Sequence, residues 1–367
     1  MIVILSSFTV IYCVVIMLFI YGWHTIPIFK SQPEKTNTWS AVSIVICCRN
    51  EENRLMPLID SIKKQSYQNF EVIFANDHST DNSLAILLEQ EKENNQFRVI
   101  NTTHQGKKIA LREAIAITKN PLIFCCDADC TLPVSLLEKI VSYHLRYNPD
   151  LLIGGVKYTA NNFFQTMQAT EFGSLMASAA GSCGVKMPIL CSGANLSFPI
   201  STWKKYAQNL NDKAVSGDDM FLMLNVKHNQ GNIQFLKSPD AFVTTQPADT
   251  TSDFFNQHQR WSAKTTLYHD WQTIFVAITV FAWCLIWIIA VIHAFFNVKI
   301  WGLVILTWCI KLFCDGCLLI PFFNFSQQKK AILTIIPAAV TYPFYIVYTA
   351  ISGLFTSFRW KNSVAKK

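Results

Sequence analysis

The sequence predicts an α/β domain built on a mostly parallel sheet, combined with membrane-spanning helices. Three observations lead to this prediction. Between residues 41 and 270, short β-branched apolar runs alternate with helical stretches, the pattern of a parallel sheet covered by helices. Long uncharged apolar runs lie before residue 30 and after residue 271. The composition of the 367 residues, 51% hydrophobic and 15% charged, is intermediate between soluble and membrane proteins.

The first expected element is a membrane anchor. Residues 1–29 contain no Asp, Glu, Lys or Arg, and the apolar run 1–21 is long enough to cross about 30 Å of hydrocarbon as a helix. Trp23 and His24 follow where an interfacial belt is expected. A cleaved signal peptide would show a basic leader and a small-residue cleavage site. Neither is present, so the sequence favours an uncleaved anchor.

Four strands are expected in the central part of the chain, each an apolar run followed by a polar loop. They are residues 42–48, 70–75, 97–101 and 122–126. The helices between them are expected to end near residues 65, 90 and 118, and residues 79–81 are expected to cap the second one. Ligands of such sheets bind outside the carboxyl ends of the strands. Three of these ends carry acids, at residues 49–51, 76–77 and 127–129.

Three more apolar segments follow the α/β part, at residues 274–292, 300–320 and 331–355. Lys311 and Asp315 are spaced to pair on one helix face. Such a pair is either a functional site in the membrane or an internal contact to a neighbouring helix, and both interpretations stay open. The last segment contains Pro337 and Pro343. Since proline kinks or breaks helices, a re-entrant or sharply bent segment is one hypothesis for it.

The net charge of +7 comes entirely from the last part of the chain. Residues 1–271 hold 23 basic and 23 acidic residues, whereas residues 272–367 hold eight basic residues and one acid. This distribution argues against a basic nucleic-acid-binding face. Basic loops mark the cytosolic side of membrane proteins, but a full last span would put the basic tail outside. The expected domains are 1–29 (anchor), 41–270 (cytosolic α/β domain), 271–358 (membrane region) and 359–367 (basic tail).

The twelve cysteines do not form the pattern of a disulfide framework. Four of them lie in predicted strands and five others in membrane segments. Cys314 and Cys317 form a C-x-x-C, but a structural zinc site needs four ligands. We expect reduced cysteines that are buried as small hydrophobic side chains.

Asp127 and Asp129 lie one residue apart at the carboxyl end of a predicted strand. Two carboxylates so placed can converge on one Mg²⁺ or Mn²⁺ ion, which prefers oxygen ligands and bridges to substrate phosphates. The alternative is a polar turn that caps the following helix. The chain contains neither a G-x-x-x-x-G-K-[ST] nor a G-x-G-x-x-G motif. A nucleotide diphosphate would then be held by a metal and by side chains.

Two further motifs carry candidate chemistry. Asp218 and Asp219 precede an apolar helix, and such a pair suits a general base with a structural partner. The alternative is that these acids only cap the helix and interact favourably with the positive end of its dipole. Lys107 is either a contact for the diphosphate or a solvated residue at a helix start.

The segment Gln257-His-Gln-Arg260-Trp261 directly precedes the second apolar segment. Arginine offers a planar fork for phosphate. Tryptophan offers a flat face, either for a sugar or for the membrane interface. An Arg/Trp anchor at the membrane surface is the simpler interpretation if the motif is taken alone.

Together these motifs resemble a membrane-bound family 2 glycosyltransferase with a GT-A catalytic domain, over about residues 41–261. An acid at the second strand end (Asp77), D-x-D, an acidic pair and Q-x-x-R-W occur here in the order of that family. The loop at 49–51 resembles the family's nucleotide clasp, and the loop at 193–195 resembles its acceptor-side loop. The chain departs from the family at Asn76, where Asp is frequent, and at Asp218, where Glu is usual.

The resemblance implies transfer of a sugar from a nucleotide donor with inversion at the anomeric carbon. It makes Asp219 the general base, and Asp218 and Arg260 further catalytic residues. It assigns the donor to Arg49, Glu51, Asp77, Lys107 and Asp127, the metal (Mg or Mn) to Asp127 and Asp129, and the acceptor to Gly193, Asn195, Gln257 and Trp261.

The acceptor is expected to be a lipid. Q-x-x-R-W occurs in polysaccharide synthases and in enzymes that glycosylate lipids, and three or four spans are few for a polymer channel. Residues 162–180 are apolar with few charges, and they are expected to form either an amphipathic helix at the membrane surface or a core helix. We therefore expect a single-sugar transferase acting on a membrane lipid, similar in layout to ceramide glucosyltransferases. A processive polysaccharide synthase is the alternative.

The resemblance also implies the location and partners. The protein is expected to be multi-pass, of the bacterial inner-membrane type, with the α/β domain in the cytosol because nucleotide sugars are cytosolic. Its partners would be a nucleotide sugar, the bilayer and no nucleic acid, and a homo-oligomer would supply further spans. A hypothesis from another class is a non-catalytic scaffold or transporter subunit with a ligand-binding α/β domain. The intact acids and Arg260 argue against it.

Overall fold

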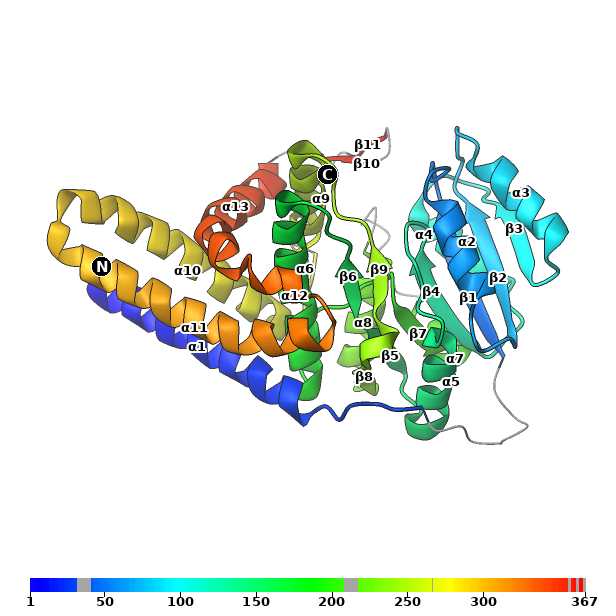
Figure 1. The fold of residues 1–367 in the computed structure, drawn as a ribbon, viewed down its shortest axis with the longest axis horizontal. Helices are drawn as coiled ribbons and strands as arrows, with labels where there is room; N and C mark the ends of the chain where they lie inside the picture. Colours follow the sequence, from blue (N-terminus) through cyan, green and yellow to red (C-terminus); the bar gives the residue numbers. More distant parts are fainter. Residues whose placement is uncertain (32–40, 208–216, 266, 356–357, 361–362, 366–367) are drawn as a thin grey trace. The chain divides into compact units, whose positions relative to one another are not determined.

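A computed structural model describes residues 1–31, 41–207, 217–265, 267–355, 358–360 and 363–365. The chain divides into two compact units, each drawn from more than one stretch of sequence. The α/β unit comprises Pro27–Lys157 and Cys191–Gln246. The helical unit comprises Met1–Ile26, Tyr158–Leu190 and Pro247–Lys367. Figure 1 labels the elements of both units.

A seven-stranded sheet forms the centre of the α/β unit, in the order β3-β2-β1-β4-β7-β5-β8 (Figure 1). β1 is parallel to β2 and β4, and β2 is parallel to β3. β7 is antiparallel to both of its neighbours, whereas β5 and β8 are parallel. The predicted mostly parallel sheet is therefore confirmed. The strands are β1 Val42–Cys48, β2 Phe70–Asn76, β3 Phe97–Asn101, β4 Leu122–Asp127, β5 Leu151–Gly154, β7 Leu196–Pro199 and β8 Ile233–Leu236.

Helices cover both faces of this sheet, as the apolar strands require. Ile44, Val45 and Ile46 are consecutive and all at most 1% exposed, so both faces of β1 are buried. A small second sheet pairs β6 (Val156–Tyr158) with β9 (Val243–Thr245). The helices of the unit are α2 Leu55–Lys63, α3 Ser83–Glu93, α4 Lys107–Ala116, α5 Leu136–Tyr147, α7 Ile200–Tyr206, α8 Asp218–His228 and the short η2 Pro239–Ala241.

The strand register aligns the carboxyl ends that the sequence singles out. Cys48 lies opposite Asn76, which lies opposite Asn101. On the other side of β1, Cys47 lies opposite Asp127. The chain order reverses at β1, because β2 and β3 add on one side and β4 on the other. Such a switch point is where ligands of α/β sheets bind.

The helix after β2 begins later than the sequence predicts. The expected cap was residues 79–81, but α3 begins at Ser83. Ser79 Oγ accepts the Asn50 N–H at 3.1 Å, and the Asp81 carboxylate accepts the Glu52 N–H at 3.1 Å. Side chains expected to cap the helix thus fasten the loop after β1.

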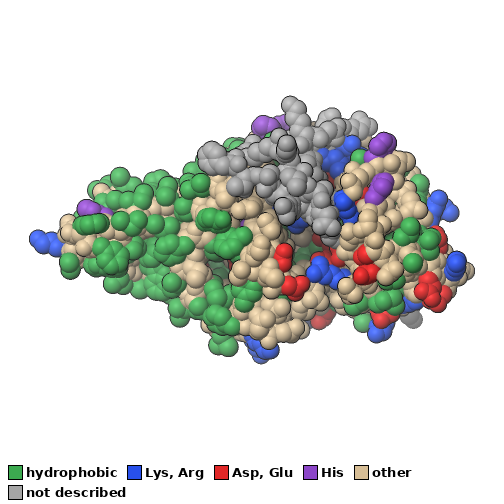
Figure 2. Space-filling model, turned by 90° about the horizontal axis from the view of Figure 1, so that it is seen from above, with side chains coloured by type: hydrophobic (Ala, Val, Ile, Leu, Met, Phe, Trp, Pro, Cys, Tyr) green, Lys and Arg blue, Asp and Glu red, His purple; other side chains and the backbone are tan. Residues whose placement is uncertain are grey.

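Four helices of the helical unit are long and apolar enough to cross a membrane, counted over the described residues. Figure 2 shows hydrophobic side chains covering these helices, with charged side chains gathered over other elements. One N-terminal and three C-terminal membrane helices agree with the prediction of two to three at the C-terminal side. They are α1 Ile2–Thr25, α10 Trp271–Phe296, α11 Trp301–Phe325 and α13 Ile335–Phe355.

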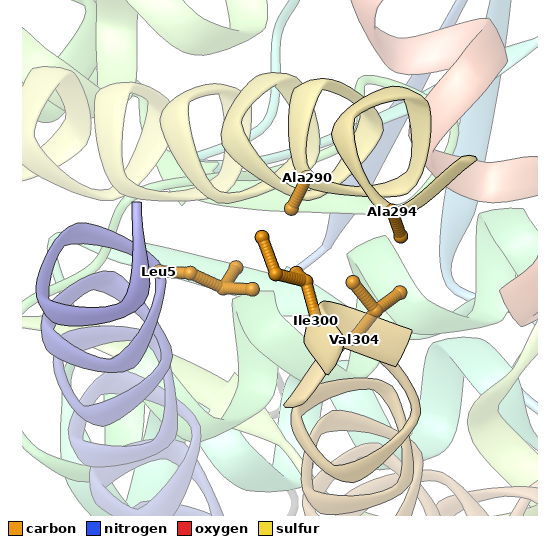
Figure 3. Close-up of a cluster of buried hydrophobic side chains, with 5 residues drawn as sticks. All are labelled: Leu5, Ala290, Ala294, Ile300 and Val304. Atoms are coloured by element: carbon orange, nitrogen blue, oxygen red, sulfur yellow. The ribbon is translucent and has the colours of Figure 1, made fainter. Parts of the chain in front are cut away.

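The helical unit contains further elements besides these four helices. A cluster of Leu5, Ala290, Ala294, Ile300 and Val304 joins α1, α10 and α11 (Figure 3). Its small alanines allow the helices to approach closely. β10 and β11 pair as a short antiparallel ladder. The remaining elements are α6 Phe163–Gly184, α9 Thr251–Thr265, η3 Val298–Ile300, α12 Lys329–Ile332, β10 Phe358–Trp360 and β11 Ser363–Ala365.

The helix α6 is a core helix, which decides between the two alternatives for residues 162–180. Phe163 is its only exposed residue. Close backbone contact fixes α6 on α1, because a Cβ atom at Gly184 would lie 2.0 Å from the Gly22 carbonyl oxygen. A Cβ atom at Gly181 would likewise lie 2.5 Å from the Phe19 carbonyl oxygen.

Lys311 and Asp315 form the expected ion pair, and it is an internal one. The Tyr12 hydroxyl donates to Asp315 at 2.7 Å. The Lys311 ammonium lies over the rings of Tyr12, Trp283 and Tyr342, at 5.0, 5.3 and 4.8 Å from their centroids. These residues come from α1, α10, α11 and α13, so the pair joins all four apolar helices.

All twelve cysteines carry free thiols, and nine of them are buried. Their burial agrees with the expectation that they act as small hydrophobic side chains.

Candidate active site

Arg49 and Asp77 meet where β1 and β2 end. Arg49 Nη1 lies 4.0 Å from Asp77 Oδ2, and the two side chains are 10% and 2% exposed. Asp77 Oδ1 accepts the Gly106 N–H at 2.7 Å. Gly106 has a φ of +139°, a conformation that favours glycine. A guanidinium and a backbone N–H therefore hold the buried Asp77 carboxylate at the edge of the sheet.

The loop after β1 is rigidly folded against the turn after β2. Asn50 adopts a φ of +52°, and its side-chain oxygen accepts the Thr80 N–H at 2.8 Å. The Glu51 N–H donates to Ser83 Oγ at 2.8 Å. The Glu51 carboxylate lies 3.8 Å from Arg54 and is 11% exposed. These contacts fix the backbone of the 49–51 loop beside Asp77.

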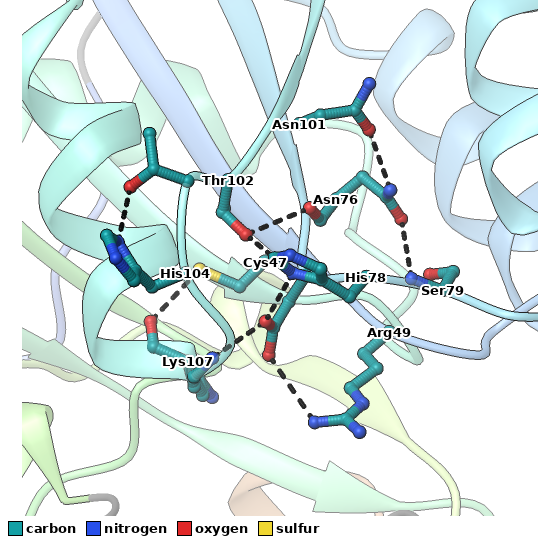
Figure 4. A network of polar contacts seen from close by, with 12 residues as sticks. Cys47, Arg49, Asn76, His78, Ser79, Asn101, Thr102, His104 and Lys107 are labelled. Carbon is teal, nitrogen blue, oxygen red and sulfur yellow. Dashed lines mark hydrogen bonds and ion pairs between the residues drawn. The ribbon is translucent and has the colours of Figure 1, made fainter.

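Asn76 explains one departure from the family pattern. Its Nδ2 donates to the Asn101 side chain at 2.8 Å, and its Oδ1 accepts the Ser79 N–H at 3.3 Å (Figure 4). An amide can donate and accept at once, whereas an ionised aspartate only accepts. Asn76 thus ties β3 to the turn that carries Asp77.

Asp127 forms an ion pair with Lys107 at the end of β4. Lys107 Nζ lies 2.6 Å from Asp127 Oδ1, and both side chains are somewhat over one third exposed. Desolvation alone would lower the pKa of Lys107, but the Asp127 carboxylate outweighs it and raises that pKa well above its usual range. Lys107 therefore stays cationic. The Cys130 thiol contacts Asp129 Oδ1 at 3.8 Å.

The two carboxylates of D-x-D fit a divalent cation. Asp127 and Asp129 offer oxygen ligands, which Mg²⁺ and Mn²⁺ prefer. Over the described residues, no group of three or more His, Cys, Asp or Glu side chains is placed to hold an ion. An ion here would complete its coordination with water and with substrate oxygens, as Mg²⁺ commonly does.

The adjacent acids Asp218 and Asp219 lie in different surroundings at the start of α8. Asp219 is partly exposed, and its carboxylate accepts the N–H groups of Gly193 and Met220, both at 2.9 Å. Asp218 is 5% exposed, and its Oδ1 lies 3.7 Å from Lys108 Nζ. Asp219 is therefore the member of the pair that a substrate can reach.

The loop at 193–195 contacts Asp219 through its backbone. A Cβ atom at Gly193 would lie 3.5 Å from the Asp219 carboxylate, an ordinary van der Waals contact, so the approach does not require glycine. Asn195 is 2% exposed, and its Nδ2 donates to the carbonyl oxygens of Gly155 and Ala241, at 2.9 and 3.0 Å. The Asn195 side chain thus holds the loop in place.

Gln257, Arg260 and Trp261 lie on α9, in the helical unit. The other candidate residues lie in the α/β unit. Gln257 Oε1 is buried and has no hydrogen-bond partner among the described residues. The Trp261 ring lies 4.9 Å from His258 and 6.2 Å from Phe172, centroid to centroid.

Two features of these sites are absent from the sequence predictions. Lys108 neutralises Asp218. In the sequence, nothing marks Lys108 except that it is the second lysine of Gly-Lys-Lys. Glu171 on α6 faces His258 within Q-x-x-R-W. Glu171 is the only acid in residues 162–184, which is a weak signal in an apolar helix.

Residues 43–216 match the sequence model of Glycosyl transferase family 2. Poly-β-1,6-N-acetyl-D-glucosamine synthase of Staphylococcus epidermidis is 24% identical over 248 residues, which cover 64% of this chain and 57% of that protein. β-Monoglucosyldiacylglycerol synthase of Nostoc is 28% identical over 132 residues, which cover 33% of this chain and 28% of that protein. The chain spans 29 to 38% of the length of three further curated glycosyltransferases.

Among solved structures, the chain is similar to mannosyltransferase PcManGT from Pyrobaculum calidifontis in complex with GDP-Man and Mn²⁺. The TM-score is 0.60 at 14% identity, with 96% of this chain and 99% of that chain covered. At this identity the similarity establishes a shared fold.

Proposed function

Residues 43–216 belong to glycosyl transferase family 2, and from this premise we propose that the chain transfers one sugar from a nucleotide sugar to a membrane lipid. One observation carries the proposal: the strand ends at the switch point hold a buried Arg49–Asp77 pair and a Lys107–Asp127 pair. A nucleotide needs polar groups for its base and cationic groups for its diphosphate. Four candidate membrane helices in the same chain favour an acceptor that resides in the bilayer.

The donor would lie along the ends of β1, β2 and β4. Asp77 would accept hydrogen bonds from the nucleobase, while Arg49 holds that carboxylate in place. Glu51 would contact the ribose from its fixed loop. Lys107 would contact the diphosphate as a point charge. A uridine diphosphate sugar is our first candidate, on the strength of the family resemblance.

Asp127 and Asp129 would hold Mg²⁺ or Mn²⁺. The bound ion would supply charge that neutralises the diphosphate leaving group. We expect Asp129→Ala to abolish the Mn²⁺-dependent part of donor binding, measured by calorimetry with and without Mn²⁺. Equal donor affinity in both conditions for the unmodified chain would contradict the metal site.

Asp219 would act as the general base. Its carboxylate would take the proton from the acceptor hydroxyl as that oxygen attacks the anomeric carbon, and direct displacement of the diphosphate inverts that carbon. Arg260 would stabilise the negative charge that develops on the leaving group. Gln257 and Trp261 would bind the acceptor, as would the backbone at Gly193, whose loop Asn195 holds.

The similarity to poly-β-1,6-N-acetyl-D-glucosamine synthase favours a second candidate function, that of a processive polysaccharide synthase. Its match covers 248 residues of alignment, whereas the match to the glycolipid synthase covers 132. A processive synthase would extend its own product and carry it across the bilayer. Its product would therefore show a ladder of masses, in contrast to the single sugar increment that we expect.

The test is a panel of nucleotide sugars offered to the purified full chain in vesicles that contain extracted lipids. We expect release of nucleoside diphosphate with one donor, together with a lipid product heavier by one sugar in mass spectrometry. A polymer ladder would support the second function instead. No turnover with any donor would support a non-catalytic scaffold or transporter subunit.

The proposed site requires a cytosolic α/β unit, because nucleotide sugars are cytosolic. We place the protein in the bacterial inner membrane with both the donor site and the 49–51 loop facing the cytosol. Cross-linking in membranes would reveal a homo-oligomer, in which neighbouring copies add spans.

A further inference from the structure

A buried acid–base pair joins α6 and α9 in the helical unit. Nε2 of His258 lies 3.2 Å from Oε1 of Glu171, and the two side chains are 7% and 8% exposed. His258 follows Gln257 directly and precedes Trp261 by three residues. None of the roles proposed above uses this pair.

The contacts of the His258 ring indicate where its protons lie. Nδ1 lies 2.9 Å from the backbone oxygen of Phe254. A carbonyl oxygen only accepts hydrogen bonds, so Nδ1 carries a proton. An ionised carboxylate also only accepts, so Nε2 faces Glu171 favourably only when Nε2 carries a proton as well or when Glu171 is protonated. The pair therefore shares one proton, carried by Nε2 or by the carboxylate, at ion-pair distance; Nε2 has no aligned hydrogen-bond partner among the described residues.

Aromatic rings surround the imidazole and connect it to the motif. The ring centroid of His258 lies 4.1 Å from that of Phe254, 4.9 Å from that of Trp261 and 5.7 Å from that of Tyr345. Trp261 also contacts Phe172, the residue after Glu171 on α6. A change in the protonation of the His258–Glu171 pair therefore affects Trp261 directly, because the rings of His258 and Trp261 are in contact.

The charges around His258 set the direction of its titration. Burial alone would lower its pKa, but the Glu171 carboxylate and the Phe254 carbonyl outweigh burial and raise that pKa above 6.5. Glu171 from α6 and Tyr345 from α13 are the titratable groups that face the ring. The other charged residues of α9 are Asp253, Arg260 and Lys264. A raised pKa means that the pair is complete below about pH 6.5 and is lost as the pH rises through the raised value.

We propose that His258 is a positioning residue whose proton-bridged contact with Glu171 holds Arg260 and Trp261 in place for transfer. Without that proton, Glu171 would be a buried charge lacking its counter-charge, which is strongly unfavourable. Separation of α9 from α6 relieves this cost, and it displaces Trp261. The inference rests on the proposed function, because it requires Arg260 and Trp261 to act in the reaction.

The first measurement addresses the proton and needs no activity. The full chain, labelled with ¹³C-histidine and held in nanodiscs, is titrated by NMR, and the His258 signal is assigned by its loss in His258→Gln. We expect a His258 pKa above 6.5 in the unmodified chain. We expect it to fall by at least one unit, about tenfold in proton affinity, in Glu171→Gln. A His258 pKa at or below 6.5 in the unmodified chain would overturn the proposal.

The second measurement addresses positioning. The rate of transfer, with the donor and lipid found by the panel above, should fall about tenfold per pH unit above the His258 pKa. Glu171→Gln leaves no buried charge at position 171, so it should remove this alkaline limb of the pH–rate profile. The double variant Glu171→Gln/His258→Gln, which keeps two neutral partners, should lose the limb. An alkaline limb that stays at the same pH in both variants would contradict a positioning role.

Two controls separate positioning from mere destabilisation. The Gln168 side chain holds the segment before α9 on α6 without a titratable group, through two hydrogen bonds with the Ala248 backbone at 2.9 and 3.0 Å. Gln168→Ala should lower the rate equally at all pH values. His269→Gln removes an exposed histidine and should change nothing. If the His258 pKa is raised but no donor is turned over, the proposed function is contradicted. The positioning role is then contradicted as well, because it rests on that function. The raised pKa would still support a proton shared by His258 and Glu171.

Discussion

Asp218 and Asp219 show how the surroundings of a residue decide what it can do. Both are aspartates at the first turn of α8. Asp218 is buried against Lys108, whereas Asp219 is partly exposed and accepts two backbone N–H groups. A general base must be within reach of the substrate. Asp219 meets this condition, and Asp218 fits a supporting role.

We expect Asp219→Asn to abolish transfer while the chain still binds its donor. The amide has nearly the same shape but cannot take a proton, and general bases contribute about 10²–10⁴-fold to rates. The measurement is kcat together with the donor Kd. Asp60→Asn, at an exposed site on α2, should leave both unchanged. Near-normal turnover in Asp219→Asn would show that another group takes the proton.

Lys108 should matter for stability through Asp218. Removing one partner of a buried ion pair leaves the other charge uncompensated, so we expect Lys108→Met to cost about 3 kcal/mol. Unfolding in denaturant measures this cost. Lys108→Met/Asp218→Asn should recover part of it, because the second change removes the unpaired charge. If the double variant is less stable than Lys108→Met, the pairing is not what stabilises this site.

Residue types and spacing predicted the acids of the site, and also Arg49 and Lys107, but not Lys108 and Glu171. D-x-D, Asp77 and the 218–219 pair were visible because they follow apolar strands or precede an apolar helix. Lys108 and Glu171 were not, because each depends on an element distant in sequence to supply its partner. Buried pairing of this kind is set by tertiary packing, and single-sequence patterns carry no trace of it.

At the scale of elements, the contact between α1 and α6 depends on glycine. Gly22 and Gly184 approach so closely that a Cβ atom at Gly22 would lie 1.9 Å from the Gly181 carbonyl oxygen. Small residues allow such backbone contact between helices in apolar surroundings. The same α6 carries Glu171 and Gln168, which hold α9 and the segment before it. The position of α9 therefore depends on where α6 packs against α1.

We expect Gly184→Val to push α6 away from α1. The new Cβ atom would lie 2.0 Å from the Gly22 carbonyl oxygen, which cannot move without its helix. Overpacking of this kind lowers the free energy of unfolding by about 1–3 kcal/mol. Thermal unfolding in detergent should show a lower midpoint, and transfer should be slower. Gly302→Ala, where nothing lies within 4 Å, is the matched control. An unchanged midpoint in Gly184→Val would contradict the close contact.

Strands were predicted more closely than helix starts, for a physical reason. β1 and β3 have the predicted bounds, and β2 and β4 are each one residue longer. A buried strand is an unbroken apolar run, which a sequence displays directly. The start of α3 was predicted too early, because Ser79 bonds to the loop after β1, and Asp81 accepts both from that loop and from the N–H of Ser83, where the helix begins.

At the scale of the whole molecule, the last apolar helix raises the question of topology. α13 is one continuous helix of 21 residues, with Pro337 in its first turn and Pro343 inside it. A full crossing would move the basic tail to the outside, against the rule for basic segments. The tail side chains lie outside the described part of the chain, of which only the backbone of the short ladder of β10 and β11 remains.

The contacts of α13 favour a re-entrant segment. Just before its first residue, Thr334 Oγ1 lies 2.6 Å from Thr170 Oγ1 on α6. Near its end, Ser352 Oγ accepts from Gln259 on α9 at 3.2 Å. Neither α6 nor α9 is a candidate span. A helix of 21 residues is about as long as the ~30 Å hydrocarbon layer, but both ends of α13 contact helices that are not candidate spans.

We therefore expect the C-terminal tail to share the side of α9, with α13 dipping into the bilayer and bending at Pro343. An epitope added after Lys367 should be inaccessible to antibody in intact spheroplasts and become accessible on permeabilisation. An epitope inserted at Asn297, between α10 and α11, should be accessible in intact spheroplasts and serves as the positive control. Because Lys329 and Lys330 lie between α11 and α13, a re-entrant α13 puts these lysines and the tail on one side, which satisfies the charge rule for both. A tail that is accessible in intact spheroplasts would mean that α13 crosses fully.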